Sequence, residues 1–141
     1  LDHSQVSPGR VSFEIAEGAV VDRLELARRF VAVLHGMGCH FGIDDFGHGV
    51  GSFTTLRDLA IDYLKIDGAY TRDLRPGGLN HQVVQAVTSL ARIQGFRVVA
   101  EQVELPADFE ALRALGVDFI QGYFVERPQR LGAGGAALQT A

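Results

Sequence analysis

Short apolar runs alternate with longer amphipathic segments along most of this chain. Five apolar runs end in polar side chains, and they lie within residues 11–17, 41–45, 63–67, 97–104 and 118–123. The segments between them repeat apolar side chains at helical spacing. Because alternating strands and helices build a sheet through crossover connections, the pattern predicts an α/β fold with a parallel sheet.

The predicted helices have recognisable ends. The spacing predicts helices over residues 20–37, 80–94 and 106–115, with a shorter helix over 53–59 and one turn over 70–74. Glycine stands at the end of each of the three long helices, as C-terminal glycines do. Pro106 suits the first turn of the third helix.

The ends of the chain differ in composition from its middle. Residues 1–10 are rich in turn-forming residues and show no periodicity, which indicates a leader loop. Residues 131–141 are mostly glycine and alanine, which indicates a weakly ordered tail. The segment 11–130 is therefore predicted to be the folded domain.

Composition excludes several classes of function. The length of 141 residues indicates one domain, and a formal charge of −4 argues against binding to a nucleic acid polymer. No apolar run approaches the roughly 18–20 residues of a membrane span, and the start does not resemble a signal peptide. The single cysteine, Cys39, cannot form an internal disulfide, which is consistent with a reducing cytoplasm.

The strongest chemical signal lies at the end of the second run, where Phe41-Gly42-Ile43 is followed by Asp44 and Asp45. Two adjacent carboxylates at a strand end repel each other unless a cation lies between them. Hard divalent cations prefer carboxylate oxygens. For this pair alone, a solvated acidic turn remains an alternative to a metal site.

The other predicted strands also end in polar side chains, which are Glu14 and Glu17, Lys65, Glu101 and Glu104, and Gln121. Functional sites of parallel α/β folds lie at the carboxyl ends of the strands. These residues therefore favour a site with metal ligands, a proton-transfer group and a hydrogen-bonding amide. The alternatives are a Lys65–Asp67 pair, a solvated Glu101 and a buried Gln121 amide.

With these residues in place, the sequence resembles the C-terminal portion of an EAL domain, the bacterial phosphodiesterase that opens cyclic di-GMP. The matching stretches are Phe13–Glu17, Ile43–Gly47 with Gly49, Leu64–Asp67, Val98–Glu104, and Gln121–Tyr123 with Arg127–Pro128. The resemblance implies a parallel β/α barrel of TIM type, with a site for two Mg²⁺ or Mn²⁺ ions at its carboxyl face.

The resemblance also implies roles for the polar residues at the strand ends. Glu14 would bind one metal ion, Asp44 would bridge two ions, and Asp45 would hold the second. Lys65 would orient the attacking water or hydroxide, and Glu101 would help to hold or deprotonate it.

Three further residues receive supporting roles from the same resemblance. Gln121 would lie near the nucleotide or the water, Glu17 would anchor the loop after Asp45, and Glu104 would support the fourth strand end. Two residues depart from the family pattern: His48 replaces a small residue or threonine, and Gln102 replaces a glycine.

The resemblance covers only part of a barrel. A complete β/α barrel has eight strands in about 250 residues, whereas this sequence predicts five strands. The N-terminal strands that carry the family's Glu-Ala-Leu motif and a metal-binding asparagine are not in this sequence. These 141 residues alone are therefore expected to bind metal poorly, to be inactive, and to form a homodimer that covers the open sheet edges.

The expected function of the parent domain is metal-dependent hydrolysis of cyclic di-GMP to linear pGpG. One alternative is a catalytically degenerate EAL domain that acts as a cyclic di-GMP receptor or a protein-association module. Another is a different metal-dependent β/α enzyme that acts on a small carboxylate or phosphate. The resemblance further implies an upstream sensory or diguanylate cyclase domain, in the cytoplasm or in the cytoplasmic part of a membrane-anchored signalling protein.

Overall fold

A computed structural model of the chain describes residues 6–47 and 56–128. Its sheet has five strands in sequence order: β1 (Ser12–Ala16), β2 (His40–Phe46), β3 (Tyr63–Ile66), β4 (Arg97–Ala100) and β5 (Phe119–Ile120). Every neighbouring pair of strands is parallel. The prediction of a parallel α/β sheet is confirmed.

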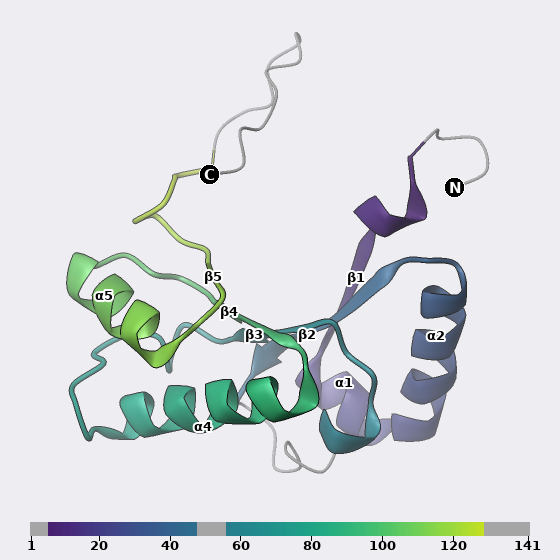
Figure 1. Ribbon diagram of the computed structural model, residues 1–141, viewed down its shortest axis with the longest axis horizontal. Helices are drawn as coiled ribbons and strands as arrows, with labels where there is room; N and C mark the ends of the chain where they lie inside the picture. The colour runs from purple at the N-terminus through teal and green to yellow at the C-terminus, as the bar shows by residue number, and fades with distance from the viewer. Residues whose placement is uncertain (1–5, 48–55, 129–141) are drawn as a thin grey trace, which may run out of the picture.

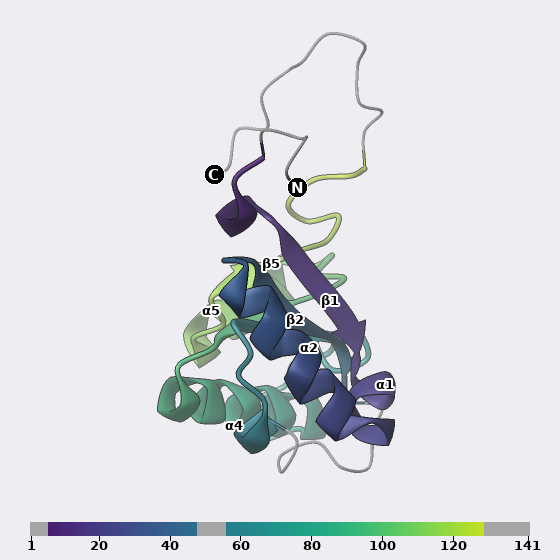
Figure 2. The ribbon, with the colours of Figure 1, turned by 90° about the vertical axis from the view of Figure 1, so that its right-hand side faces the viewer.

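The helices connect the strands along one side of this sheet. The elements are α1 (Glu17–Asp22) and α2 (Leu24–Gly36) after β1, α4 (Leu79–Gln94) after β3, and α5 (Pro106–Leu115) after β4. A short 3₁₀ helix, η1 (Pro8–Arg10), precedes β1 within the predicted leader loop. Figure 1 shows α2, α4 and α5 following the curve of the sheet, and Figure 2 shows α2 beside β1 at the sheet edge.

The hydrophobic core lies between the sheet and these helices. Successive side chains of a strand point to opposite faces, so Leu64 and Ile66 of β3 point into the core, and both are fully buried. Tyr63 and Lys65 alternate with them and therefore point to the other face. One strand thus builds the core with one set of side chains and presents polar groups with the other.

The predicted helix over 20–37 is wrong as a single helix, because the chain forms two helices that meet at Arg23. The backbone of Arg23 leaves the helical region, with φ −141° and ψ 49°. The break keeps α1 near the carboxyl end of β1, where Glu17 is bound, while α2 runs back along the sheet and buries Val31 and Leu34. One straight helix starting at Glu17 could not both keep Glu17 at the end of β1 and pack Val31 and Leu34 against the sheet.

The other helix predictions agree closely with the structure. The helix over 80–94 begins one residue early and ends at Gly95 in the left-handed region, with φ 87°. The helix over 106–115 is confirmed. The predicted turn over 70–74 is an irregular loop instead, and the start of the predicted helix over 53–59 lies outside the described residues.

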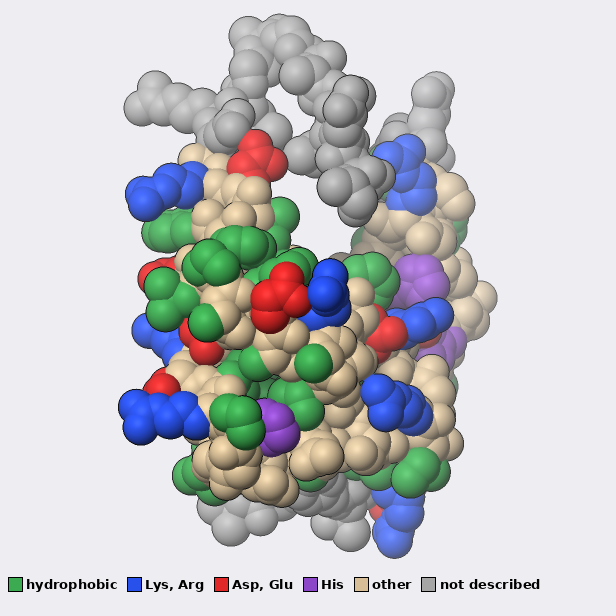
Figure 3. Space-filling view, turned by 60° about the vertical axis from the view of Figure 1, so that its left-hand side comes forward, with side chains coloured by type: hydrophobic (Ala, Val, Ile, Leu, Met, Phe, Trp, Pro, Cys, Tyr) green, Lys and Arg blue, Asp and Glu red, His purple; other side chains and the backbone are tan. Residues whose placement is uncertain are grey.

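Two further features of the described residues concern membrane-spanning helices and the distribution of surface charge. None of their helices combines the length and the apolar character needed to cross a membrane. On the face drawn in Figure 3, acidic and basic side chains lie interspersed with hydrophobic ones rather than in a patch of one sign.

Candidate metal centre

The carboxyl ends of the strands bring three predicted site residues around Lys65, the only lysine in the sequence. Its Nζ atom lies 3.1 Å from Glu14 Oε2, 3.2 Å from Asp44 Oδ1 and 2.7 Å from Glu101 Oε1. Only 10% of the lysine side chain is exposed. The alternative in which Lys65 pairs with Asp67 alone is therefore wrong, because its ammonium is held by three other carboxylates.

Burial and charge together set the protonation of this cluster. Burial alone would lower the pKa of Lys65, but hydrogen bonds from its ammonium to Glu101 and Glu14 raise that pKa above its ordinary value. Burial raises the pKa of Glu101; Lys65 opposes this rise, and the charges of Asp44 and Asp45 add to it. The lysine therefore stays charged, and the carboxylates outnumber it.

The excess of carboxylates fits a divalent cation. Ligand oxygens of Asp44, Asp45 and Glu101 all lie within 4.8 Å of one another. Mg²⁺ and Ca²⁺ bind oxygen ligands at about 2.0–2.6 Å, so one ion can contact oxygens at this spacing. Glu14 lies beside this group rather than in it, because its two oxygens face Tyr63 and Lys65.

An irregular backbone allows two successive aspartates to reach the same place. In a regular strand Asp44 and Asp45 would point to opposite faces. The pairing of β2 with β3 is irregular between Ile43 and Phe46, and Asp45 has φ 54°. A positive φ in a non-glycine residue is strained and is common at functional sites. The strain here breaks the alternation that would have separated the two carboxylates.

The start of the loop after β2 is held at Gly47 from two sides. Glu17, which is 2% exposed, accepts a hydrogen bond from Gly47 N at 3.0 Å. The hydroxyl of Tyr70 donates to Gly47 O at 2.9 Å. A Cβ on Gly47 would lie 2.4 Å from the Tyr70 ring, so only glycine fits under it. The sequence predicted an anchoring role for Glu17 and missed Tyr70.

Tyr63 is a second tyrosine that the sequence analysis missed. Its hydroxyl donates a hydrogen bond to Glu14 Oε1 at 2.9 Å. Burial, together with this bond to Glu14, raises the pKa of Tyr63 to about 12. The available signal was the alternation on β3, which puts Tyr63 on the same face as Lys65.

Gln121 and Glu104 line a cavity of about 320 Å³ next to Glu101. Gln121 is exposed, so the alternative of a buried amide is wrong. Its backbone N–H donates to Ala100 O at 2.8 Å and extends the pairing of β4 with β5. This pairing brings the fourth and fifth strand ends, and their polar side chains, to one cleft.

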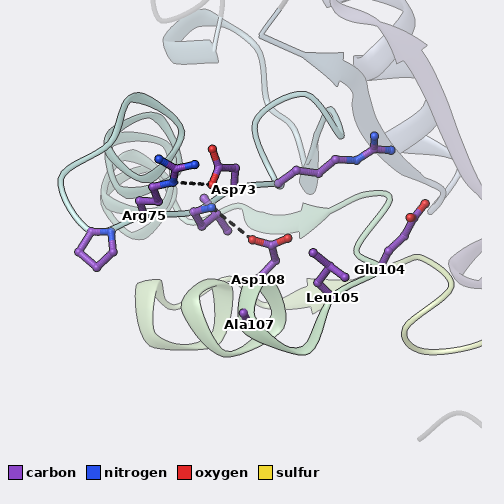
Figure 4. A pocket seen from close by; sticks show the side chains of 9 residues that line it. Asp73, Arg75, Glu104, Leu105, Ala107 and Asp108 are labelled. Carbon is purple, nitrogen blue, oxygen red and sulfur yellow. Dashed lines mark hydrogen bonds and ion pairs between the residues drawn. The ribbon is translucent and has the colours of Figure 1, made fainter.

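A larger cavity, of about 610 Å³, lies between the loop after β3 and the start of α5. Three of its polar side chains are already paired, since Arg75 binds Asp73 at 2.8 Å and Asp108 accepts from Leu74 N at 3.2 Å (Figure 4). The smaller cavity is the better candidate because it adjoins the carboxylate cluster.

Gln102 follows Glu101 directly and has a left-handed backbone with φ 54°. Glycine reaches this region without strain, whereas another residue loses about 1 kcal/mol or more. The Gln102 side chain packs on Gly68 and accepts a hydrogen bond from Arg72. These contacts explain how the chain holds a glutamine where the resemblance leads one to expect a glycine.

Comparison with known proteins identifies the family. The model of the EAL domain matches residues 1–128. The chain belongs to the EAL domain family. Cyclic di-GMP phosphodiesterase PdeF from Escherichia coli is 36% identical over 127 residues, which are 90% of this chain and 17% of PdeF. Cyclic di-GMP phosphodiesterase PdeB from Shewanella oneidensis is 34% identical over 121 residues, which are 86% of this chain and 14% of PdeB.

Solved structures of EAL proteins share the fold. PaMucR phosphodiesterase in complex with c-di-GMP has a TM-score of 0.83 and 31% identity, over 87% of this chain and 55% of that one. Klebsiella pneumoniae BlrP1 with manganese and cy-diGMP has a TM-score of 0.79 and 28% identity, over 84% and 30%. The five-stranded sheet of this EAL chain is therefore part of a β/α barrel of TIM type, as the resemblance implied.

Replacing the central ammonium tests the electrostatics of the cluster. In Lys65→Met the carboxylates of Glu14, Asp44 and Glu101 would face one another without a cation. We expect the unfolding free energy in EDTA to fall by about 1–3 kcal/mol, less than for a fully buried group, because these carboxylates are partly exposed. Urea unfolding followed by circular dichroism measures this loss.

The loss of unfolding free energy in Lys65→Met should depend on pH. Lys65 opposes the rise that burial causes in the pKa of Glu101, so without Lys65 that pKa rises further in the folded state, and protonation at about pH 5 relieves repulsion that persists at about pH 8. The loss should therefore be smaller at the lower pH, and a larger loss there would contradict this account. Arg75→Met, which breaks an exposed pair with Asp73, serves as a control, with an expected loss under about 0.5 kcal/mol.

Proposed function

We propose that the EAL domain to which this chain belongs hydrolyses cyclic di-GMP to linear pGpG with the help of Mg²⁺ or Mn²⁺. The observation that carries the proposal is the convergence of Glu14, Asp44 and Glu101 on the buried Lys65, with Asp45 beside them. Relatives named as cyclic di-GMP phosphodiesterases support the substrate. The manganese complex of BlrP1 supports the class of metal.

Hydrolysis of a phosphodiester requires a water oxygen to bond to phosphorus while one P–O ester bond breaks and the ring opens. The water loses a proton, and the departing oxygen takes up a proton from the solvent to become a hydroxyl group. Divalent ions bound by Glu14, Asp44 and Asp45, with Glu101 nearby, would supply a nucleophilic hydroxide and neutralise charge on the phosphoryl group. Lys65 stays protonated, and one of its three N–H groups would donate to the water or to a phosphate oxygen where a metal ion replaces it as the partner of a carboxylate. Glu101, whose pKa is raised by burial, would accept a proton from the water.

The cleft beside the cluster provides a place for the nucleotide. Gln121, Tyr123 and Glu104 line the cavity that adjoins Glu101. The exposed amide of Gln121 can donate to and accept from the nucleotide or a water molecule. We assign Gln121 to nucleotide or water binding, Glu104 to support of the β4 end, and Glu17 to anchoring the loop that follows Asp45.

A hydrolysis assay on the full-length protein, with and without EDTA, tests the proposed function. We expect conversion of cyclic di-GMP to pGpG that EDTA abolishes and that Mg²⁺ or Mn²⁺ restores. Turnover that survives EDTA would contradict the metal-dependent mechanism. A folded protein that hydrolyses no cyclic dinucleotide would contradict the proposal as a whole.

Two carboxylate variants in the same assay distinguish the proposed roles. Asp44→Asn should lower turnover by about 100-fold or more, because a shared metal ligand is lost and small displacements at a reacting centre are costly. Glu17→Ala should cost about 10-fold, because it only loosens the loop at Gly47. Glu110→Gln, on the exposed face of α5, is the matched control and should leave turnover unchanged. Equal losses for Asp44→Asn and Glu17→Ala would count against these roles.

A second candidate function is a receptor that binds cyclic di-GMP without cleaving it. The strained Gln102 favours this alternative, because it puts a long side chain directly beside a residue proposed to be catalytic, where the family pattern has a glycine. Calorimetry separates the two functions. A receptor binds the nucleotide equally well with and without metal and leaves it intact.

The edge of the sheet supports a proposal about association. Among the described residues, strand β1 pairs with β2 alone, and Phe13 on it contacts Phe30 of α2 with ring centroids 6.2 Å apart. The outer face of α2 exposes Leu26, Phe30 and Val33, and Met37 directly after the helix is exposed as well. We propose that these 141 residues alone form a homodimer through this surface. Light scattering should report a dimer at micromolar concentration, and a stable monomer would contradict the proposal.

The cytoplasmic location and the upstream sensory or diguanylate cyclase domain stay predictions from the sequence. An EAL domain coupled to such a domain would respond to the signal that the upstream domain receives.

A further inference from the structure

One tyrosine crosses a neighbouring strand to reach a candidate metal ligand. In the pairing of the strands, Glu14 of β1 lies opposite Gly42 of β2, and Gly42 lies opposite Tyr63 of β3. The three residues form one row across three strands. A Cβ on Gly42 would lie only 2.4 Å from the Tyr63 ring, so the ring lies directly over this glycine. The missing side chain of Gly42 is what allows a residue of β3 to touch one of β1.

The Tyr63 hydroxyl and the Lys65 ammonium hold opposite oxygens of the same carboxylate. Tyr63 donates to Glu14 Oε1 at 2.9 Å, and Lys65 donates to Glu14 Oε2 at 3.1 Å. Lys65 also contacts Asp44 and Glu101, so its position is set by several carboxylates. Tyr63 is a neutral donor, and it can keep its hydrogen bond to Oε1 when Oε2 takes a different partner.

We propose that Tyr63 is a positioning residue that fixes the direction of the Glu14 carboxylate for metal binding. This inference rests on the proposed function, in which Glu14 is a ligand of the first metal ion. Among the described residues the Glu14 side chain is 38% exposed, so burial alone does not fix the direction of its carboxylate. Loss of a hydrogen-bonding partner behind a metal ligand typically costs about 10- to 100-fold in metal affinity or activity.

The substitution Tyr63→Phe separates this role from simple packing. It keeps the aromatic ring over Gly42 and removes only the hydroxyl that binds Glu14. If the ring only filled space on this face of the sheet, the variant would bind metal as the wild type does. If the hydroxyl orients Glu14, metal affinity falls while the fold is retained.

Isothermal titration of Mn²⁺ into the full-length protein tests the inference. We expect Tyr63→Phe to raise the Kd for Mn²⁺ by about 10-fold with an unchanged circular dichroism spectrum. Activity should recover at saturating Mn²⁺, because the loss is in affinity. Ser89→Ala is the matched control: it removes a hydroxyl that donates a 2.8 Å hydrogen bond to Gln85 O on the exposed side of α4, and should leave the Kd unchanged.

A double-mutant cycle shows whether Tyr63 acts through Glu14. In a Glu14→Ala background, which removes the oxygen that accepts from Tyr63, Tyr63→Phe should change the remaining Mn²⁺ affinity by less than about 2-fold, because residues that act through one contact are not additive. A full 10-fold loss in that background would overturn the inference. Wild-type affinity in the single variant Tyr63→Phe would overturn it as well.

The effect of Tyr63→Phe on Mn²⁺ affinity can be interpreted independently of the hydrolysis assay. A wild-type protein that binds Mn²⁺, loses affinity on Tyr63→Phe and hydrolyses nothing would refute the proposed function and support the role of Tyr63. A wild-type protein that does not bind Mn²⁺ would overturn the positioning role.

Discussion

One buried ammonium holds the ends of three strands together. Glu14, Asp44 and Glu101 come from β1, β2 and the residue after β4, and Lys65 of β3 lies within 3.2 Å of all three. Carboxylates this close repel one another unless a cation lies between them. The neighbours of Lys65 along β3, Leu64 and Ile66, are fully buried. The hydrophobic core therefore fixes the position of the charge on which the site depends.

The cluster carries a net negative charge. Its four carboxylates, with that of Asp45 included, outnumber the single ammonium of Lys65. Buried charge is tolerated when it is paired, and here the pairing is incomplete. A divalent ion would complete it, and the shared spacing of Asp44, Asp45 and Glu101 suits one. The same electrostatic demand explains the raised pKa of Lys65, which keeps the only fixed cation of the cluster charged.

The part of the site that follows from strand order could be predicted from the sequence. Parallel strands end at one edge, so polar residues at the ends of five predicted runs had to lie near one another. The partners across strands could not be predicted in the same way. Tyr63 reaches Glu14 over an intervening strand, and the helix break at Arg23 depends on where Glu17 is bound. The positive φ of Asp45 is likewise a tertiary effect, because the residue type does not require it.

Gly42 and Gly47, in and just after β2, indicate in the sequence that other groups approach the backbone closely there. A glycine inside a strand often marks the close approach of another group. Here a Cβ added to Gly42 in β2, or to Gly47 just after it, would lie 2.4 Å from a tyrosine ring. Tyr63 and Tyr70 both follow β2 in the sequence, and their rings pack on Gly42 and Gly47. The segment around β2 therefore supplies adjacent acids in a strained backbone, and β3 with its loop supplies the groups that hold them. A strained backbone such as that of Asp45 persists only when surrounding contacts hold it in place. The hydrogen bonds that Gly47 makes with Glu17 and Tyr70 are such contacts, close to Asp45 in the chain.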